Sequence, residues 1–277
     1  MGTLDEISRG LDKTYFESDL RTPTAEMCLE WAAWGSLNAA APAVAAATAG
    51  GGEGLPEPFV YDLVNTAREV LAQLSTPMLL NFSSSFTAPG HKKHNLSAAR
   101  IDETATLFTE LLRDLERLLA TDPAFMLGPW LASARRLAGN ATDCIDTQIA
   151  GDIGDCADFM EWNARAQLTT WYPVIGSASA PIVQQNGRDH DYARKQWSGL
   201  IQDVFIPRTE LYRKQALSDA AASSAFNGTA ALESYARLSF AWQTSYPSKY
   251  PTQPQGDPVT VSAELWRKYS SFFSSCG

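Results

Sequence analysis

The sequence predicts an all-α protein, a bundle-like domain of about eight to ten helices with no substantial sheet. Three observations lead to this fold class. Apolar residues recur at helical spacing over most of the 277 positions. Proline and small polar side chains stand where such stretches would begin. Alternating patterns typical of half-buried strands are nearly absent, so a sheet has few residues from which to form.

The expected elements follow the chain in order. Residues 1–21 are polar and weakly patterned and are expected to form an N-terminal arm, whereas residues 22–277 form one helical domain. Apolar stripes predict helices over 22–37, 61–86, 101–120, 121–134, 157–171, 191–206, 209–224, 227–246 and 261–273. The range 101–120 is the clearest, because apolar residues line one face and charged residues cover the other.

Proline and glycine indicate where helices end. The alanine-rich stretch 39–58, which contains three consecutive glycines, is expected to be a loop. Pro77 should kink, end or begin a helix, and Pro207 should break or bend one, because proline lacks an amide proton. Residues 172–190 and 247–258 are predicted to be irregular loops.

Composition and charge limit the classes of partner. The chain is 45% hydrophobic and 19% charged, so it can bury a sizeable core. Its net charge of -9 argues against nucleic acid or an anionic membrane as the main partner. No apolar run approaches the roughly 20 residues of a membrane-spanning helix. The opening residues carry no stretch typical of a signal peptide.

Motifs for N-linked glycosylation favour a secreted protein, although no signal peptide is evident in the sequence. Four such motifs begin at Asn81, Asn95, Asn140 and Asn227. Each motif is short and arises often by chance, and all four are usable only if the chain enters the secretory route. They predict a glycoprotein on that condition.

The four cysteines allow three disulfide pairings. Cys144 and Cys156 bracket a segment whose two glycines permit a closed loop, and Cys28 and Cys276 can tie the two ends together. Four unpaired thiols are the alternative. None of the cysteines stands at zinc spacing with histidine, and no cofactor motif appears, so neither a metal nor a cofactor is expected.

Motifs for nucleophilic catalysis, zinc hydrolysis and phosphate binding are absent from the sequence. Glycoside hydrolysis needs two carboxyl groups roughly 5–10 Å apart. Glu161, Asp191 and Glu210 are the only candidates for such a pair, and each can equally serve as a helix cap or an ion-pair partner. The residues alone therefore name no catalytic pair.

Two segments carry more Trp, Arg, Asn and Gln than a helix needs: E-W-N-A-R-A-Q-L-T-T-W at 161–171 and D-Y-A-R-K-Q-W-S-G-L-I-Q-D-V-F-I-P-R at 191–208. Such side chains suit a wall against sugars or another domain, or a buried helix pair whose polar groups satisfy one another. Together with 59–71, 122–135 and 250–257, they closely resemble the C-terminal helical domain of the alpha-N-acetylglucosaminidases, glycoside hydrolase family 89.

The resemblance implies part of an exo-acting, retaining hydrolase that removes terminal alpha-linked N-acetylglucosamine, in animals from heparan sulfate. In the family the catalytic carboxylates come from a (β/α)₈ barrel, for which this sequence has no strand–helix alternation. The implied partners are that missing barrel and a glycan with terminal N-acetylglucosamine, and no catalytic residue is carried over. The implied location is lysosomal or extracellular.

The resemblance also assigns roles to single residues. The wall of the substrate pocket is expected to include Trp171, Arg165, Asn163 and Tyr192. Structural support for that wall is expected from Gln167, Lys195, Trp197 and Arg208. The sequence departs from the usual family pattern at Arg194 and Phe205, in the long loop 172–190 and in the segment between Cys144 and Cys156.

Three functional interpretations follow. The chain is the C-terminal piece of such a hydrolase, active only with its barrel. Alternatively, it is a free-standing helical module that binds glycans or a protein without catalysis. The third interpretation is an enzyme in its own right that uses Glu161 or Asp191. A large exposed apolar face favours the first, because a domain separated from its partner exposes the surface it has lost.

Overall fold

The computed structural model describes residues 22–48, 54–87, 96–140, 155–169, 175–177, 180–182, 195–245 and 249–276. Within these ranges lie eight α-helices: α2 (Ala25–Thr48), α3 (Glu57–Thr87), α4 (Ala98–Leu119), α5 (Leu127–Arg136), α7 (Cys156–Thr169), α8 (Ile206–Ala221), α9 (Gly228–Gln243) and α10 (Pro258–Tyr269). The predicted all-α class is therefore confirmed. The predicted arm, residues 1–21, lies outside the described residues.

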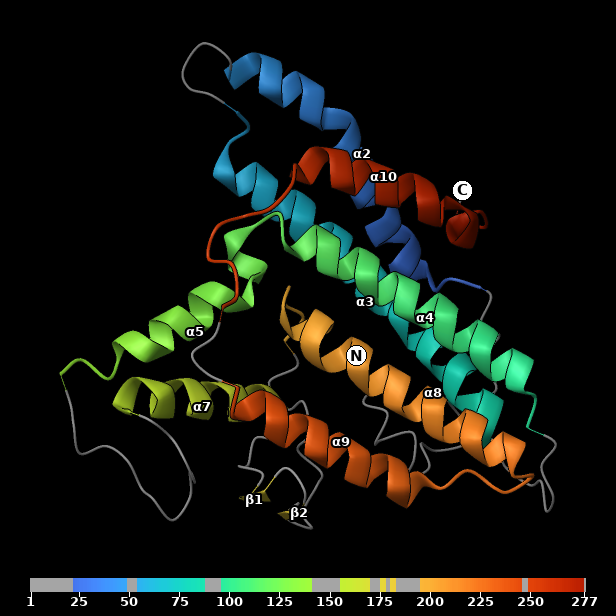
Figure 1. Ribbon diagram of the computed structural model, residues 1–277. Helices are drawn as coiled ribbons and strands as arrows, with labels where there is room; N and C mark the ends of the chain where they lie inside the picture. Colours follow the sequence, from blue (N-terminus) through green and yellow to red (C-terminus); the bar gives the residue numbers. More distant parts are fainter. Residues whose placement is uncertain are drawn as a thin grey trace.

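Helix α4 forms the centre of the bundle, packed against both α3 and α8 (Figure 1). Its sequence explains this position, because apolar side chains recur along it every three or four residues. Eight of these side chains are buried: Ile101, Ala105, Phe108, Leu111, Leu112, Leu115, Leu118 and Leu119. The hydroxyl of Ser97 accepts a hydrogen bond from the amide of Arg100 at 3.3 Å and begins the helix.

Helices α2 and α10 pack against each other and cover one end of the bundle (Figure 1). Trp31 of α2 stacks on Trp266 with 5.1 Å between ring centroids, and on Phe273 with 4.3 Å. The indole N–H of Trp34 donates to the hydroxyl of Ser262 at 2.7 Å. Aromatic stacking and a satisfied indole donor therefore join the beginning of the domain to its end.

Disulfide bonds involve three of the described cysteines. Cys28 in α2 is bonded to Cys276, one of the pairings that the sequence left open. Cys156, at the start of α7, is also disulfide-bonded. Its candidate partner Cys144 lies outside the described residues. The Cys28–Cys276 bond spans 248 positions of the chain and so restricts the unfolded state over almost the whole domain.

The prediction of a loop over 39–58 is wrong for most of that stretch. Helix α2 continues to Thr48 with Pro42 inside it, and α3 already begins at Glu57. Alanine has the highest helix propensity of all residues, and a run of alanines extends the helix beyond its apolar stripe. Residues 49–53 lie outside the described residues.

The two internal prolines have different effects. Helix α3 continues through Pro77, where buried Leu74 and Leu79 hold both sides of the helix against the core. Pro207 stands in the first turn of α8 and follows a π-helical turn, Ile201–Phe205. The wider turn removes the need for an amide proton at Pro207, so the chain bends there without separating into two helices.

Two short strands correct the prediction of an entirely irregular loop over 172–190. Strand β1 (Ile175–Ser177) pairs antiparallel with β2 (Ala180–Ile182), with Ile175 opposite Ile182. The sequence places one isoleucine in each strand, and isoleucine is a residue type that favours strands. Three residues per strand do not make a substantial sheet, so the fold class is unchanged.

The remaining helices form a second layer (Figure 1). Helix α9 packs against α8 and α7, and α7 packs against α5. None of the helices in the described ranges is long and apolar enough to cross a bilayer. The α5–α7 pair is thus linked to the rest of the described helices through the packing of α7 on α9.

The Cys28–Cys276 bond should contribute measurably to stability. Replacing both cysteines by serine is expected to lower the free energy of unfolding by about 2–4 kcal/mol, because the unfolded chain gains conformational freedom. Urea titration followed by circular dichroism measures the change. Cys28→Ser alone should cost as much as the double variant, and an additive cost for the two single variants would contradict the bond.

Candidate functional site

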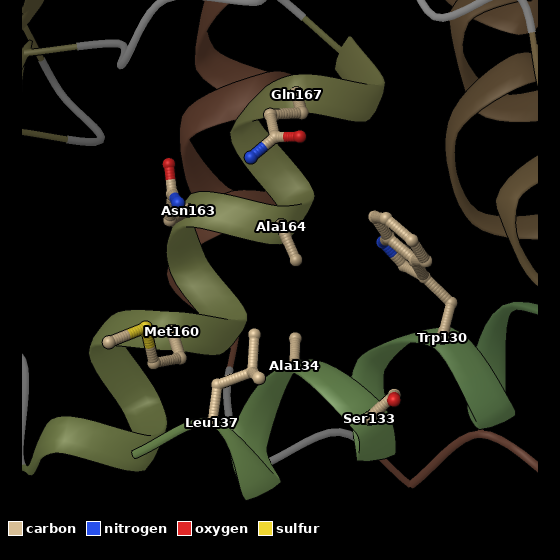
Figure 2. Close-up of a pocket in the computed structure, with 8 residues that line it drawn as sticks. All are labelled: Trp130, Ser133, Ala134, Leu137, Met160, Asn163, Ala164 and Gln167. Atoms are coloured by element: carbon tan, nitrogen blue, oxygen red, sulfur yellow. The ribbon is translucent and has the colours of Figure 1, made fainter.

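A groove opens to solvent between α5 and α7 (Figure 2). Its volume is about 160 Å³. Eight side chains line it: Trp130, Ser133 and Ala134 from α5, Leu137 directly after α5, and Met160, Asn163, Ala164 and Gln167 from α7. On each helix these residues stand three or four positions apart, so they form one continuous face.

Helix α5 is positioned by contacts at its beginning. The amide of Leu127 donates to the carbonyl of Ser198 at 3.0 Å, and the amide of Ser198 donates to the carbonyl of Phe125 at 2.8 Å. At Gly128 a Cβ atom would stand 1.9 Å from the carbonyl oxygen of Pro251. Only glycine therefore allows the backbone around Pro251 to cross the start of α5.

The opposite face of α7 carries a buried ion pair. Arg165 is 1% exposed and Glu161 is fully buried. The guanidinium donates from Nε at 2.9 Å and from Nη2 at 2.7 Å to Oε1 of Glu161. Oε2 of Glu161 accepts from Arg135 at 3.0 Å, and Arg135 also donates to Asp158 at 2.6 Å. The Glu161 carboxylate thus pairs with Arg165 inside α7 and joins α7 to α5 through Arg135.

Arg165 also joins α7 to the C-terminal part of the chain. Its Nη1 donates to the carbonyl of Trp242 at 2.6 Å and to the hydroxyl of Ser245 at 3.1 Å. The guanidinium carbon lies 4.8 Å from the ring centre of Trp242 and 5.6 Å from that of Tyr250. Every donor nitrogen of the guanidinium is therefore engaged with protein, as a buried arginine requires.

Tyr250 extends this cluster to the turn that precedes α8. Its hydroxyl accepts from the indole N–H of Trp242 at 2.9 Å and donates to the carboxylate of Asp203. Burial, and then the carboxylate of Asp203, raise the pKa of Tyr250 above its ordinary value, so the hydroxyl keeps its proton. Gly199, at φ +90°, makes room for the tyrosine ring, which lies 2.9 Å from where a Cβ would stand.

Glu116 of α4 holds the same turn from the other side. Its Oε1 accepts from the hydroxyl of Ser198 at 2.8 Å and from the amide of Gly199 at 2.7 Å, and its Oε2 accepts from the amide of Gln202 at 3.1 Å. Burial raises the pKa of Glu116, and these three hydrogen bonds offset part of that effect. The carboxylate therefore replaces a missing side-chain cap at the start of this helix.

The structure separates the residues that the resemblance assigned to the pocket wall. Asn163 is exposed and lines the groove. Arg165 lies behind α7 in the interior, so its position is that of structural support, because no sugar can reach a side chain that is 1% exposed. Trp171 and Tyr192 lie outside the described residues.

The four residues expected to support the pocket wall lie in different parts of the structure. Gln167 lines the groove rather than supporting it from behind. Trp197 packs on Trp130 with 5.5 Å between ring centroids, and the ammonium of Lys195 lies 5.3 Å from the Trp197 ring centre. Arg208 is buried between the rings of Phe205 and Tyr235, at 4.9 and 5.1 Å, far along the chain from the groove.

The carboxylate candidates do not form a catalytic pair within the described residues. Glu161 is committed to Arg165 and Arg135. Glu210 forms a 3.2 Å ion pair with Arg213 near the surface. Asp191 lies outside the described residues. No group of three metal-binding side chains occurs in the described part of the chain.

The glycosylation candidates differ in accessibility. Asn140 and Asn227 are exposed, Asn81 is partly buried in α3, and Asn95 lies outside the described residues. The side-chain oxygen of Asn227 accepts from the amide of Ala230 at 3.1 Å and caps α9. Its amide nitrogen, the atom that would carry a glycan, is not used by this cap.

Sequence reasoning did not identify Trp130, Tyr250 or Glu116 as parts of the site. Trp130 has helical spacing like any core residue, and spacing alone cannot tell a half-exposed edge from the interior. Tyr250 lies in segment 250–257, which resembles the family, and that resemblance could have indicated its importance. Glu116 stands on the charged face of α4, where nothing distinguishes it from its neighbours.

Comparisons with known proteins agree on one family. Residues 27–268 match the family described as the alpha-N-acetylglucosaminidase C-terminal domain. Human alpha-N-acetylglucosaminidase is 29% identical over 237 residues, which make up 86% of this chain and 26% of the human protein. The chain therefore spans about a quarter of that relative.

Two solved structures of the family 89 glycoside hydrolase from Clostridium perfringens have a similar fold. One holds its substrate GlcNAc-alpha-1,4-galactose and has a TM-score of 0.56, and the other holds PUGNAc and has a TM-score of 0.55. Each is 21% identical to this chain, and the match covers 76% of this chain and 21% of the clostridial chain.

The buried ion pair should be far more important to stability than a surface pair. Glu161→Gln is expected to lower the free energy of unfolding by about 3–5 kcal/mol, because it leaves a buried guanidinium without its counter-charge. Glu233→Gln, in an exposed 3.6 Å pair with Arg237, is the matched control and should cost about 0–1 kcal/mol. Urea titration measures both, and equal costs would contradict the assigned role.

Glu116 should make stability depend on pH. Since its folded pKa is raised, protonation favours the folded state, and this contribution is present below the ordinary glutamate pKa and is lost as pH rises through the raised value. The unfolding free energies of wild type and Glu116→Gln are measured between about pH 4 and about pH 7. As the pH rises, the wild-type value should fall relative to that of the variant. A difference that shrinks towards neutral pH would refute this sign.

Proposed function

The chain belongs to the alpha-N-acetylglucosaminidase C-terminal domain family, and we propose that it is the helical domain of an alpha-N-acetylglucosaminidase-like glycoside hydrolase. In this proposal it packs on a catalytic barrel that its 277 residues do not contain, and it completes the substrate pocket of that barrel. The substrate class is a glycan that ends in alpha-linked N-acetylglucosamine, as the relatives' names and the bound clostridial substrate suggest.

The state of Glu161 carries the proposal. This carboxylate lies in the motif that most resembles the family, yet Arg165 and Arg135 occupy both of its oxygens and the side chain is fully buried. A general acid or nucleophile must reach the glycosidic bond, which a fully buried carboxylate held by two guanidinium groups cannot do. Hydrolysis would therefore depend on carboxylates from another segment.

The groove side of the α5–α7 pair supports the assignment of a pocket wall. Trp130 is 40% exposed and Leu137, directly after α5, is 77% exposed, and both border the groove. Exposed apolar side chains gathered on one face are typical of surfaces that meet a ligand or another domain. The exposure would be reduced if a barrel and its substrate covered this face.

Disulfides and accessible sequons support a secretory route. The Cys28–Cys276 bond and a disulfide-bonded Cys156 are typical of proteins that mature in an oxidising compartment. Asn140 and Asn227 are exposed, so both are available to carry a glycan. We therefore place the protein, as a glycoprotein, in the lysosome or outside the cell.

The alternative is a free-standing module that binds glycans without catalysis. The observation that favours it is the groove itself, which is built entirely from this chain. The two functions differ in their need for a partner, because the module would act alone and the hydrolase domain would not.

The pure chain is expected not to hydrolyse 4-nitrophenyl alpha-N-acetylglucosaminide, because the two described carboxylate candidates, Glu161 and Glu210, are each engaged by arginine. Release of nitrophenol is measured by absorbance, with human alpha-N-acetylglucosaminidase as positive control. Turnover by the pure chain would overturn the proposal.

A second experiment searches the genomic DNA upstream of codon 1 for the catalytic segment. Expression of that segment with and without residues 1–277 should give activity only when they are present. Its absence from the genome would favour the free-standing module.

A further inference from the structure

The groove between α5 and α7 has one aromatic end and one aliphatic end. Figure 2 shows the Trp130 indole standing off α5 opposite Ala164, with Leu137 and Met160 further along the same two helices. Trp130 and Leu137 are separated by two helical turns, or about 10 Å. The small side chains of Ala134 and Ala164 lie between these ends and leave the space open.

The aromatic end is held in place. The ring of Trp197 packs against Trp130 at 5.5 Å and 49°, so the indole is supported on one side while 40% of its residue surface remains exposed. A tryptophan fixed in this way is a flat apolar platform. The C–H face of a pyranose ring is the common ligand of such a platform, because it is apolar while the ring's edges are polar.

Two side-chain amides border the groove without other engagements. Asn163 and Gln167 stand four residues apart on α7, and neither has a hydrogen-bond partner among the described residues. Each amide offers both a donor and an acceptor. A ligand acetamido group, which presents one N–H and one C=O, is complementary to such an amide.

Charge further restricts the ligand. All eight lining side chains are neutral at pH 7, and the whole chain has a net charge of -9. A sulfate, phosphate or carboxylate group on the ligand would find no counter-charge in the groove and would be repelled at long range. The ligand that fits is therefore uncharged.

We infer that the α5–α7 groove binds a neutral 2-acetamido hexose, with the sugar ring on Trp130, the acetamido methyl group against Leu137 and Met160, and the amides of Asn163 and Gln167 on the polar edges. This inference rests on the proposed function for its biological meaning and adds the sugar contact that the pocket wall would make. Binding itself is a property of this chain and is tested without a barrel.

The test is titration of the ¹⁵N-labelled chain with methyl alpha-N-acetylglucosaminide, followed by NMR. Backbone amides of α5 and α7 are expected to shift saturably, with a dissociation constant on the order of millimolar for so small a ligand. Methyl alpha-glucoside lacks the acetamido group, so its dissociation constant should be higher by a factor of about five or more. Raising sodium chloride from about 0.05 M to about 0.5 M should leave the affinity unchanged, since no charge is involved.

Variants test the named contacts. Trp130→Ala should abolish saturable binding, and Trp130→Phe, which keeps an aromatic platform, should retain part of it. Gln167→Ala should weaken binding about threefold or more. The matched control is Gln202→Ala, an exposed glutamine away from the groove, which should bind like wild type. Circular dichroism establishes that each variant is folded.

Four results would overturn the inference: no saturable shift, equal affinity for the two sugars, shifts confined to other helices, or unchanged binding in Trp130→Ala. Concentration-dependent dimerisation that Leu137→Glu abolishes would also overturn it, because a second copy would then occupy the groove. If sugar binding fails but residues 1–277 still restore turnover to a catalytic segment, the proposed function stands and only this inference falls.

Discussion

The ion pair between Arg165 and Glu161 is the constraint on which the site depends. A guanidinium and a carboxylate can both remain charged in an interior only when nearly all their polar atoms are engaged. Here that condition draws in Arg135 from α5, the carbonyl of Trp242 from α9 and the ring of Tyr250. Segments distant in sequence are therefore fixed relative to one another by one arginine, and a change at either charge would loosen all of them together.

The same pair determines which residues of α7 face outwards. With Arg165 directed at Trp242 of α9 and Glu161 bound to Arg165, the helical period places Asn163, Ala164 and Gln167 along the groove. The groove is thus a consequence of satisfying a buried charge on the other face of the helix. Tryptophan stacking between Trp130 and Trp197 then sets the end of the groove, in a region positioned by the backbone contacts around Ser198.

Periodicity predicted the all-α class and the position of most helices, because a wide apolar stripe such as that of α4 has only one stable use. It failed where composition misled, at the alanine-rich end of α2, and where a few β-branched residues formed a hairpin. Three of the candidate site residues, Asn163, Arg165 and Gln167, lie in α7, and the sequence did not indicate which face of the helix each would occupy. Arg165 is buried and Gln167 borders the groove, and polar residues on both faces of α7 gave no indication in the sequence of which face would be buried.

The bond between Cys28 and Cys276 affects what happens when a protease cleaves the backbone. Any single cut of the backbone between these two positions leaves fragments that are still covalently joined, and the aromatic stacking of Trp31 with Trp266 and Phe273 keeps their ends together as well. Nicked molecules would therefore persist as a two-chain form that separates only under reducing conditions.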